Sequence, residues 1–227
     1  LTLTGSGSIN GTGNDGANAF SKTVTSPSTC KNCLSVGATQ QSNVVLGDNM
    51  TFSTLTFNDT TAVTMTTLGL HAAADTLHMT PEYIKMLGAE FTQHGSHSEV
   101  AVVNLDPTSP LTAGWQSGIK ITEEWYNFRN YDRSQVHVLL AMENHPTNGT
   151  PGHYPVSWIK PYGTGRVFYT SLGHRDDVID PKADIGDAEF KVRYNPPATA
   201  LMVQKHILSG IRWALGLTQA DATLGTR

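Results

Sequence analysis

Two histidines stand where strand-like runs of the sequence end. His71 follows the apolar run 62–70 and precedes three alanines. His174 follows the run 165–173 and precedes Arg175. Histidine titrates near neutral pH, so it can take up or release a proton during a reaction. Both imidazoles are therefore candidates for acid–base chemistry.

Two further clusters carry side chains of the same chemical kind. One is His94-Gly95-Ser96-His97, and the other, Glu123-Glu124-Trp125-Tyr126, follows the run 119–122. A carboxylate or a phenol near an imidazole can orient it or share its acid–base work. Any one of these residues, taken alone, is more often a hydrogen-bonded structural group or part of a solvated edge. Together they supply the components of an acid–base site.

A metal site is the alternative interpretation of the same histidines. His94 and His97 are three residues apart, which would place both on one face of a helix, but Gly95 favours a loop and no third ligand adjoins them. The candidate ligands are His71, His94 or His97, and His174, and a divalent cation held there would activate water for hydrolysis. No other cofactor is expected, because the chain has no phosphate-binding loop of the Walker type and no glycine-rich dinucleotide turn.

A sheet is needed to position these groups. Apolar runs predict strands at 62–70, 100–105, 119–128, 136–142, 154–160 and 166–172. Thr80 as N-cap, Pro81 at the first helical position and Gly88 after the last predict a short helix. A second helix is predicted after Pro196-Pro197, where apolar residues keep helical spacing up to Gly216. Strands mixed with helices indicate an α/β layer, in which ligands bind beyond the carboxyl ends of the strands.

Composition narrows the classes of partner. The 227 residues suggest one domain, or one domain and a fragment. The net charge of −4 and the lack of a lysine or arginine run argue against nucleic acid. No run approaches the roughly 20 apolar residues of a membrane span. The chain begins at Leu1 without methionine or a basic segment, so we expect a fragment or a processed product whose cellular location the sequence does not indicate.

The character of the chain changes near residue 65. Residues 1–61 are rich in glycine and threonine and predict loops and weak strands, whereas 62–218 predict the main domain and 219–227 a tail. The lone pair Cys30 and Cys33 has neither a second pair to complete a zinc site nor a following helix that would activate a thiol. We expect these cysteines to be inert.

From about residue 65 to 217 the chain resembles the ThuA-like (trehalose utilisation) domain, a relative of the class I glutamine amidotransferases. The resemblance rests on segments in the right order: 68–73, 83–91 with His94, 124–126, 155–158, 162–174 and 210–214. It implies a flavodoxin-like α/β sandwich and a role in sugar or glycoside metabolism. It also implies site positions at His71, His94, Glu124, Tyr126 and His174.

Two departures from that family carry consequences. Leu70-His71 stands where an amidotransferase places its nucleophilic cysteine, so thiol-dependent glutamine hydrolysis is not expected. The family's His-Pro segment appears as Ser109-Pro110, and the strands that normally precede residue 65 are not recognisable. A sandwich lacking those strands would expose a sheet edge, which an oligomer or a partner would cover.

Residues 13–38 resemble a different family, the subtilisin-like serine proteases. The matching segment would carry the oxyanion-hole asparagine, here Asn14, but no nucleophilic serine segment or triad aspartate segment accompanies it. A remnant protease is therefore the least favoured of the functions considered.

The leading hypothesis is a site for a sugar-like small molecule. His71, Glu124 and His174 would be catalytic, with Glu124 or His174 as base and His71 as acid or polarising group. His94, Trp125, Tyr126 and Arg175 would bind the ligand, the aromatic rings by stacking on a pyranose. The alternatives are the metal-assisted hydrolase, with His71, His94 and His97 as candidate ligands, and a non-catalytic binding or accessory module.

Overall fold

The computed structural model of the chain describes residues 9–10, 35–36, 66–183 and 192–225. Two short strands, β1 (Ile9–Asn10) and β2 (Ser35–Val36), form an antiparallel pair. Asn14, the two cysteines and all of the segment 1–61 apart from these two strands, where loops and weak strands are expected, lie outside the described residues.

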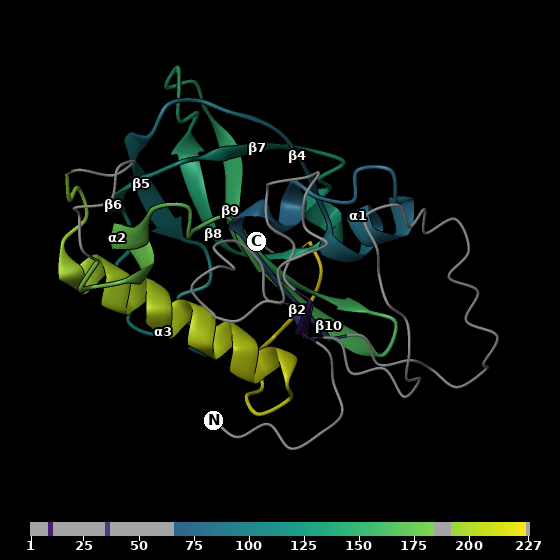
Figure 1. Cartoon of the computed structure of the whole chain (residues 1–227). Coiled ribbons are helices and arrows are strands. Elements are labelled where there is room, and N and C mark those ends of the chain that lie inside the picture. The colour runs from purple at the N-terminus through teal and green to yellow at the C-terminus, as the bar shows by residue number, and fades with distance from the viewer. Residues whose placement is uncertain (1–8, 11–34, 37–65, 184–191, 226–227) are drawn as a thin grey trace, which may run out of the picture.

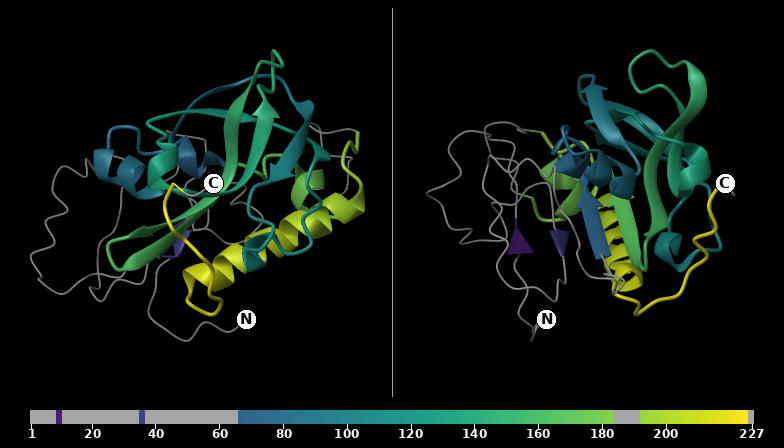
Figure 2. Two further views of the ribbon diagram at one scale, coloured as in Figure 1. Left: turned by 180° about the vertical axis from the view of Figure 1, so that it is seen from behind. Right: turned by 90° about the vertical axis from the view of Figure 1, so that its right-hand side faces the viewer.

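The main sheet has six strands in the order β3-β10-β9-β8-β5-β6. Only β3 and β10 pair in parallel among these described strands, and the other neighbours are antiparallel. Their bounds are β3 Thr66–Leu70, β5 Ser98–Asn104, β6 Ile119–Glu123, β8 His137–Asn144, β9 Pro151–Tyr162 and β10 Gly165–Thr170. The turn between β8 and β9 projects at the top of both views in Figure 2.

Each face of this sheet is covered by a different element. Helix α3 (Pro197–Ala214) packs through Val203 and Trp213 against one face, beside Phe168 of β10. Helix α1 (Pro81–Leu87) packs through Met86 and Leu87 against the other face. Figure 1 shows α1 and α3 on opposite sides of the long strands. The expected α/β class is confirmed, since apolar side chains alternate along β10 between these two cores.

Both predicted helices are present where the sequence placed them. Gly88 ends α1 in the left-handed conformation, with φ of 95°, which a residue without Cβ adopts at no steric cost. Gly216 has φ of 75° just beyond α3. The remaining helical segments of the described chain are α2 (Asp176–Ile179) and the 3₁₀ turns η3 (His71–Ala74), η4 (Pro110–Thr112) and η5 (Arg133–Gln135).

The prediction of one continuous strand over 119–128 is wrong, because the structure has two strands there. The chain leaves the main sheet after β6, and β7 (Tyr126–Arg129) pairs instead with β4 (Glu90–His94) in a separate two-stranded sheet. Glu124 and Trp125 form the link between the two sheets. Because of this break, Glu124 belongs to neither strand, and its side chain does not follow the in-and-out alternation of β6.

The parallel pair sets the geometry of the site. In β3 and β10 the last residues, Leu70 and Thr170, are directly opposite each other. The chain segments that follow both strands therefore leave the sheet at the same edge. Among the described residues, no helix combines the length and apolarity needed to cross a membrane.

Candidate functional site

His71 is the first residue of η3 and directly follows the last residue of β3 in a sharp turn. Its φ of 38° is left-handed, a conformation that costs about 1 kcal/mol or more for a residue other than glycine. The Tyr169 hydroxyl donates a 2.8 Å hydrogen bond to the His71 carbonyl and holds the turn. Gly69 lets these groups approach, because a Cβ there would lie 2.8 Å from Cδ2 of Tyr169 and 2.9 Å from Cδ1 of Leu87. The turn directs a nearly fully buried imidazole, 1% exposed, across the strand ends.

His174 lies in the loop after β10, which the buried carboxylate of Glu123 holds in place. Oε2 of Glu123 accepts the backbone N–H groups of Gly173 at 3.0 Å and His174 at 3.2 Å. Oε1 accepts those of Glu124 at 2.8 Å and Arg175 at 3.1 Å. This carboxylate joins the end of β6 to the loop that carries His174.

Glu124 lies among four imidazoles. Its Oε1 is 3.7 Å from Nε2 of His71 and 3.6 Å from Nδ1 of His174. Its Oε2 is 3.2 Å from Nδ1 of His94 and 3.9 Å from Nε2 of His97. We call Glu124 with these four histidines the imidazole cluster. One carboxylate is thus shared by four histidines from three separate segments of the chain.

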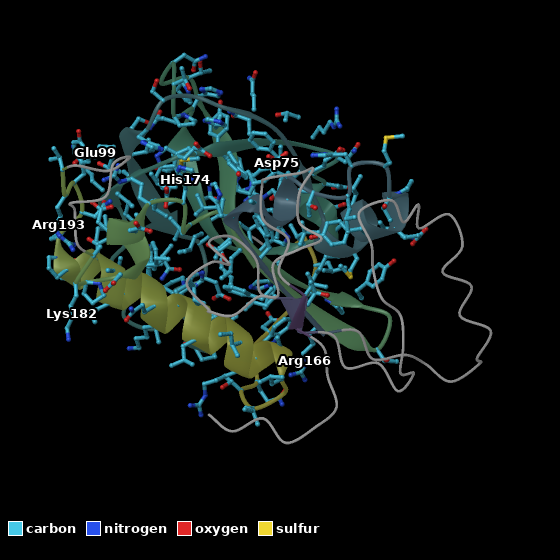
Figure 3. All side chains as sticks on the ribbon, in the orientation of Figure 1. Asp75, Glu99, Arg166, His174, Lys182 and Arg193 are labelled. Atoms are coloured by element: carbon cyan, nitrogen blue, oxygen red, sulfur yellow. The ribbon has the colours of Figure 1, made fainter. Side chains whose placement is uncertain are left out.

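Exposure increases across the imidazole cluster. The side chain of His71 is 1% exposed, that of His174 22%, that of His97 30% and that of His94 44%. A small molecule can therefore reach the cluster from the His94 side, while His71 forms its inner wall. In Figure 3, His174 lies above α3, whereas Arg166 lies at the C-terminal end of that helix.

Aromatic rings flank the cluster on one side. Tyr126 packs its ring against the His71 imidazole with centroids 4.0 Å apart, and against Phe91 at 4.2 Å. The His71 and His174 rings are 5.0 Å apart. Sequence reasoning missed Phe91 as a neighbour of the cluster, because a single apolar residue between Glu90 and Thr92 of β4 gives no signal of that role.

Burial shifts the pKa values of the inner groups. Desolvation, assisted by the nearby His174, lowers the pKa of His71 to about 3, so this imidazole is neutral at pH 7. Burial raises the pKa of Glu123, whereas the four backbone N–H groups lower it, and since each of its oxygens accepts two of them the site favours the ionised form. Burial also raises the pKa of the Tyr126 phenol, with a further contribution from Glu124, so the phenol keeps its proton.

The structure does not bring Trp125 to the cluster. Its side chain is buried in the core beneath α3, and its indole N–H donates to the Ser98 carbonyl at 2.8 Å. A ring packed in this way has no face for a pyranose. The prediction that Trp125 stacks on a ligand is therefore wrong, and the next residue, Tyr126, adjoins the histidines instead.

Arg175 is likewise directed away from the imidazole cluster. Its guanidinium donates to both carboxylate oxygens of Asp177, at 2.9 and 3.1 Å, and lies over the Tyr194 ring at 4.7 Å. It also donates to the Val192 carbonyl at 3.1 Å. The expected ligand-binding role of Arg175 is corrected to a buried ion pair that secures the loop before α3.

Two other buried histidines have structural partners. His137 lies between the Asp106 carboxylate, at 2.8 Å, and the Thr223 carbonyl, at 3.0 Å. His206 on α3 lies 2.7 Å from the Leu111 carbonyl and 2.9 Å from the Ser157 hydroxyl. Both fasten separate elements together within the core.

The comparisons with known proteins agree with this fold. The family model for ThuA, described as trehalose utilisation, matches residues 44–183. A solved ThuA-like protein from Parabacteroides merdae ATCC 43184 is similar with a TM-score of 0.52 and 19% identity, over 70% of this chain and 63% of that one. Another from Bacteroides uniformis ATCC 8492 gives a TM-score of 0.47 and 20% identity, over 69% of this chain and 60% of that one.

The chain therefore spans less than two thirds of the length of either solved structure. No curated protein matches it. The first structural likeness supports a mixed α/β fold of the flavodoxin-like type, with a curled six-stranded sheet.

Proposed function

Because the chain belongs to the ThuA family, whose description is trehalose utilisation, we propose that it binds a sugar or glycoside-derived ligand at the imidazole cluster and transfers protons on it. The observation that carries the proposal is the placement of one carboxylate, Glu124, within 3.9 Å of four imidazoles. Such a group of acid–base side chains, exposed on one side and closed on the other, is suited to a small polar ligand.

Glu124 is the proposed base. Each of its oxygens faces imidazole nitrogens, so a proton taken from a sugar hydroxyl, or from a carbon beside a carbonyl, can pass to a neighbouring histidine. His174 is the proposed partner in that transfer, because it is partly exposed and faces Glu124 at 3.6 Å, a separation that would shorten to a hydrogen bond when the ligand is bound.

His71 and Tyr126 have supporting roles in this proposal. The neutral imidazole of His71 donates or accepts a hydrogen bond without carrying charge, which suits polarisation of a ligand oxygen. The protonated phenol of Tyr126 lies against it and presents a donor of the kind that sugar hydroxyls accept.

Isothermal titration tests ligand binding. Trehalose, and disaccharides with one ring hydroxyl oxidised to a ketone, are titrated into the wild type, His71→Ala, Glu124→Gln and the control His153→Ala. His153 lies on β9 and pairs with the hydroxyl of Tyr131, which is not a member of the imidazole cluster. We expect binding by the wild type and the control, and at least about tenfold weaker binding by the two cluster variants. Equal heats for all four proteins, or no heat for the wild type, would contradict the proposal.

A further inference from the structure

The spacing of donor atoms inside the imidazole cluster differs from that of hydrogen bonds. Oε1 of Glu124 is 3.7 Å from His71 Nε2 and 3.6 Å from His174 Nδ1, beyond the roughly 3.2 Å limit of an N–H···O bond. Two ligands on one tetrahedral zinc ion, each about 2.0–2.1 Å from it, lie roughly 3.4 Å apart. Donor atoms of all three residues lie within 4.8 Å of one another.

The buried imidazole of His71 provides a second, independent observation. Within the described part of the chain, its Nδ1 has no hydrogen-bond partner, although the side chain is 1% exposed. Its Nε2 has only long contacts, 3.4 Å to the Glu124 carbonyl and 3.7 Å to the Glu124 carboxylate. A buried polar atom with such weak partners costs free energy, and a metal ion bound to Nε2 would remove this cost at Nε2, though not at Nδ1.

We propose that His71, Glu124 and His174 bind a divalent transition-metal ion such as Zn²⁺. Two imidazoles with one carboxylate form the set that zinc uses in catalytic centres, where a fourth position stays open for water or substrate. Imidazole ligands favour zinc over Mg²⁺ or Ca²⁺, which prefer oxygen. A neutral imidazole is the form that coordinates a metal.

His94 and His97 act on the carboxylate rather than on the metal. Nδ1 of His94 is 2.8 Å from the Gly95 carbonyl and 3.2 Å from Glu124 Oε2, so this nitrogen carries a proton that oxygen atoms accept. His97 Nε2 is 3.9 Å from the same oxygen. Both face Oε2 and leave Oε1 directed at His71 and His174, which is how outer residues orient a ligating carboxylate.

The metal deepens the proposed function and rests on it for the identity of the ligand. A bound zinc ion would polarise a sugar oxygen or lower the pKa of a bound water, and that water would then take the place of Glu124 as the base. The metal binding itself rests on the donor geometry and on the weakly partnered Nε2 of His71. The test therefore measures metal and sugar separately.

Competition with a chromogenic chelator measures zinc affinity of the full chain and of Glu124→Gln, His174→Ala and the control His153→Ala. Loss of an outer-shell partner costs roughly 10–100-fold in metal affinity, so loss of a ligand should cost at least ~100-fold. We expect one zinc ion per chain for the wild type and for His153→Ala. Substitution with Co²⁺ should give the strong visible absorption of a four-coordinate site, and this absorption should be lost in both cluster variants.

Circular dichroism of each variant distinguishes loss of a ligand from loss of the fold, and Glu124→Gln preserves side-chain size for this purpose. Zinc affinity that is unchanged in folded Glu124→Gln and His174→Ala would overturn the proposal. So would zinc-binding by the wild type no stronger than by a double variant lacking both groups. Trehalose titrations repeated with chelator and with zinc then report the sugar site independently, because sugar heats without zinc binding would reject the metal and keep the proposed function.

Discussion

The carboxylate of Glu123 accepts the backbone N–H of His174 at 3.2 Å, although the two residues are 51 positions apart. The same carboxylate also accepts the N–H groups of Gly173 and Arg175. Glu123 is fully buried at the end of β6, whereas the next residue, Glu124, faces the imidazole cluster. The two neighbouring acids therefore have different roles: Glu123 holds the loop after β10, and Glu124 faces the histidines.

Glu123→Gln should destabilise the protein and weaken binding at the cluster. A carboxamide has one oxygen, so in either orientation its NH₂ group faces two backbone N–H donors. We expect a loss of unfolding free energy on the order of 3 kcal/mol, measured by urea denaturation. The control Glu99→Gln, in an exposed pair with Lys120, should change stability by less than about 0.5 kcal/mol. Equal stabilities of the two variants would show that the Glu123 carboxylate does not hold the loop.

Arg175→Lys should also lower stability, by about 2 kcal/mol. Lysine cannot bond both oxygens of Asp177 and stack on Tyr194 in one geometry. Thermal unfolding of this variant is compared with Arg212→Lys on the exposed side of α3, for which we expect no resolved change. A melting temperature for Arg175→Lys equal to that of the control would be the contrary result.

His206 should make the protein less stable in acid. Burial lowers its folded-state pKa from 6.5 to about 4. Between these values the unfolded chain binds a proton that the folded chain does not, so stability falls as pH falls from 6.5 towards 4. We expect a contribution of about 2 kcal/mol between pH 7 and pH 5, read as the difference in pH dependence between wild type and His206→Gln. Parallel curves for the two proteins would refute this assignment.

Gly210→Ala should loosen the contact between α3 and the sheet. A Cβ at this position would lie 2.6 Å from the buried ring of Phe168, so the helix or the ring must shift. The cost of such overpacking is about 1–3 kcal/mol, which exceeds the gain in helix propensity. The unfolding free energy of Gly210→Ala is compared with that of Ser209→Ala by chemical denaturation. The neighbouring variant changes helix propensity without adding an atom against Phe168, so the comparison separates propensity from overpacking. An increase in stability for Gly210→Ala would contradict the prediction, because it would show that α3 or the Phe168 ring shifts at little cost in free energy.

Much of the fold is predictable from local sequence signals. The strand ends before His71 and His174, the cap of α1 at Gly88 and the length of α3 each depend on neighbouring residues, and the structure confirms them. The break between β6 and β7 is not predictable in this way. The run 119–128 is continuous in character, and only pairing with β4 divides it.

The directions of side chains at the site depend on partners distant in sequence. Trp125 is directed into the core by Ser98, and Arg175 is held by the loop that contains Val192. Glu123 has the same residue type as Glu124, and its role becomes visible only through backbone groups of the loop after β10. Residue type and spacing thus identify the chemical groups, but tertiary contacts decide which of them meet.

The pairing of β3 with β10 fixes the positions of His71 and His174 relative to each other. Because Leu70 stands opposite Thr170, His71 and His174 follow from one pair of aligned strands and do not depend on long flexible connections. Loops elsewhere can vary in length without altering the interval between these imidazoles. A one-residue slip of either strand, by contrast, would turn its side chains to the other face of the sheet and separate the two histidines. The register of this strand pair therefore determines the distance between the two imidazoles.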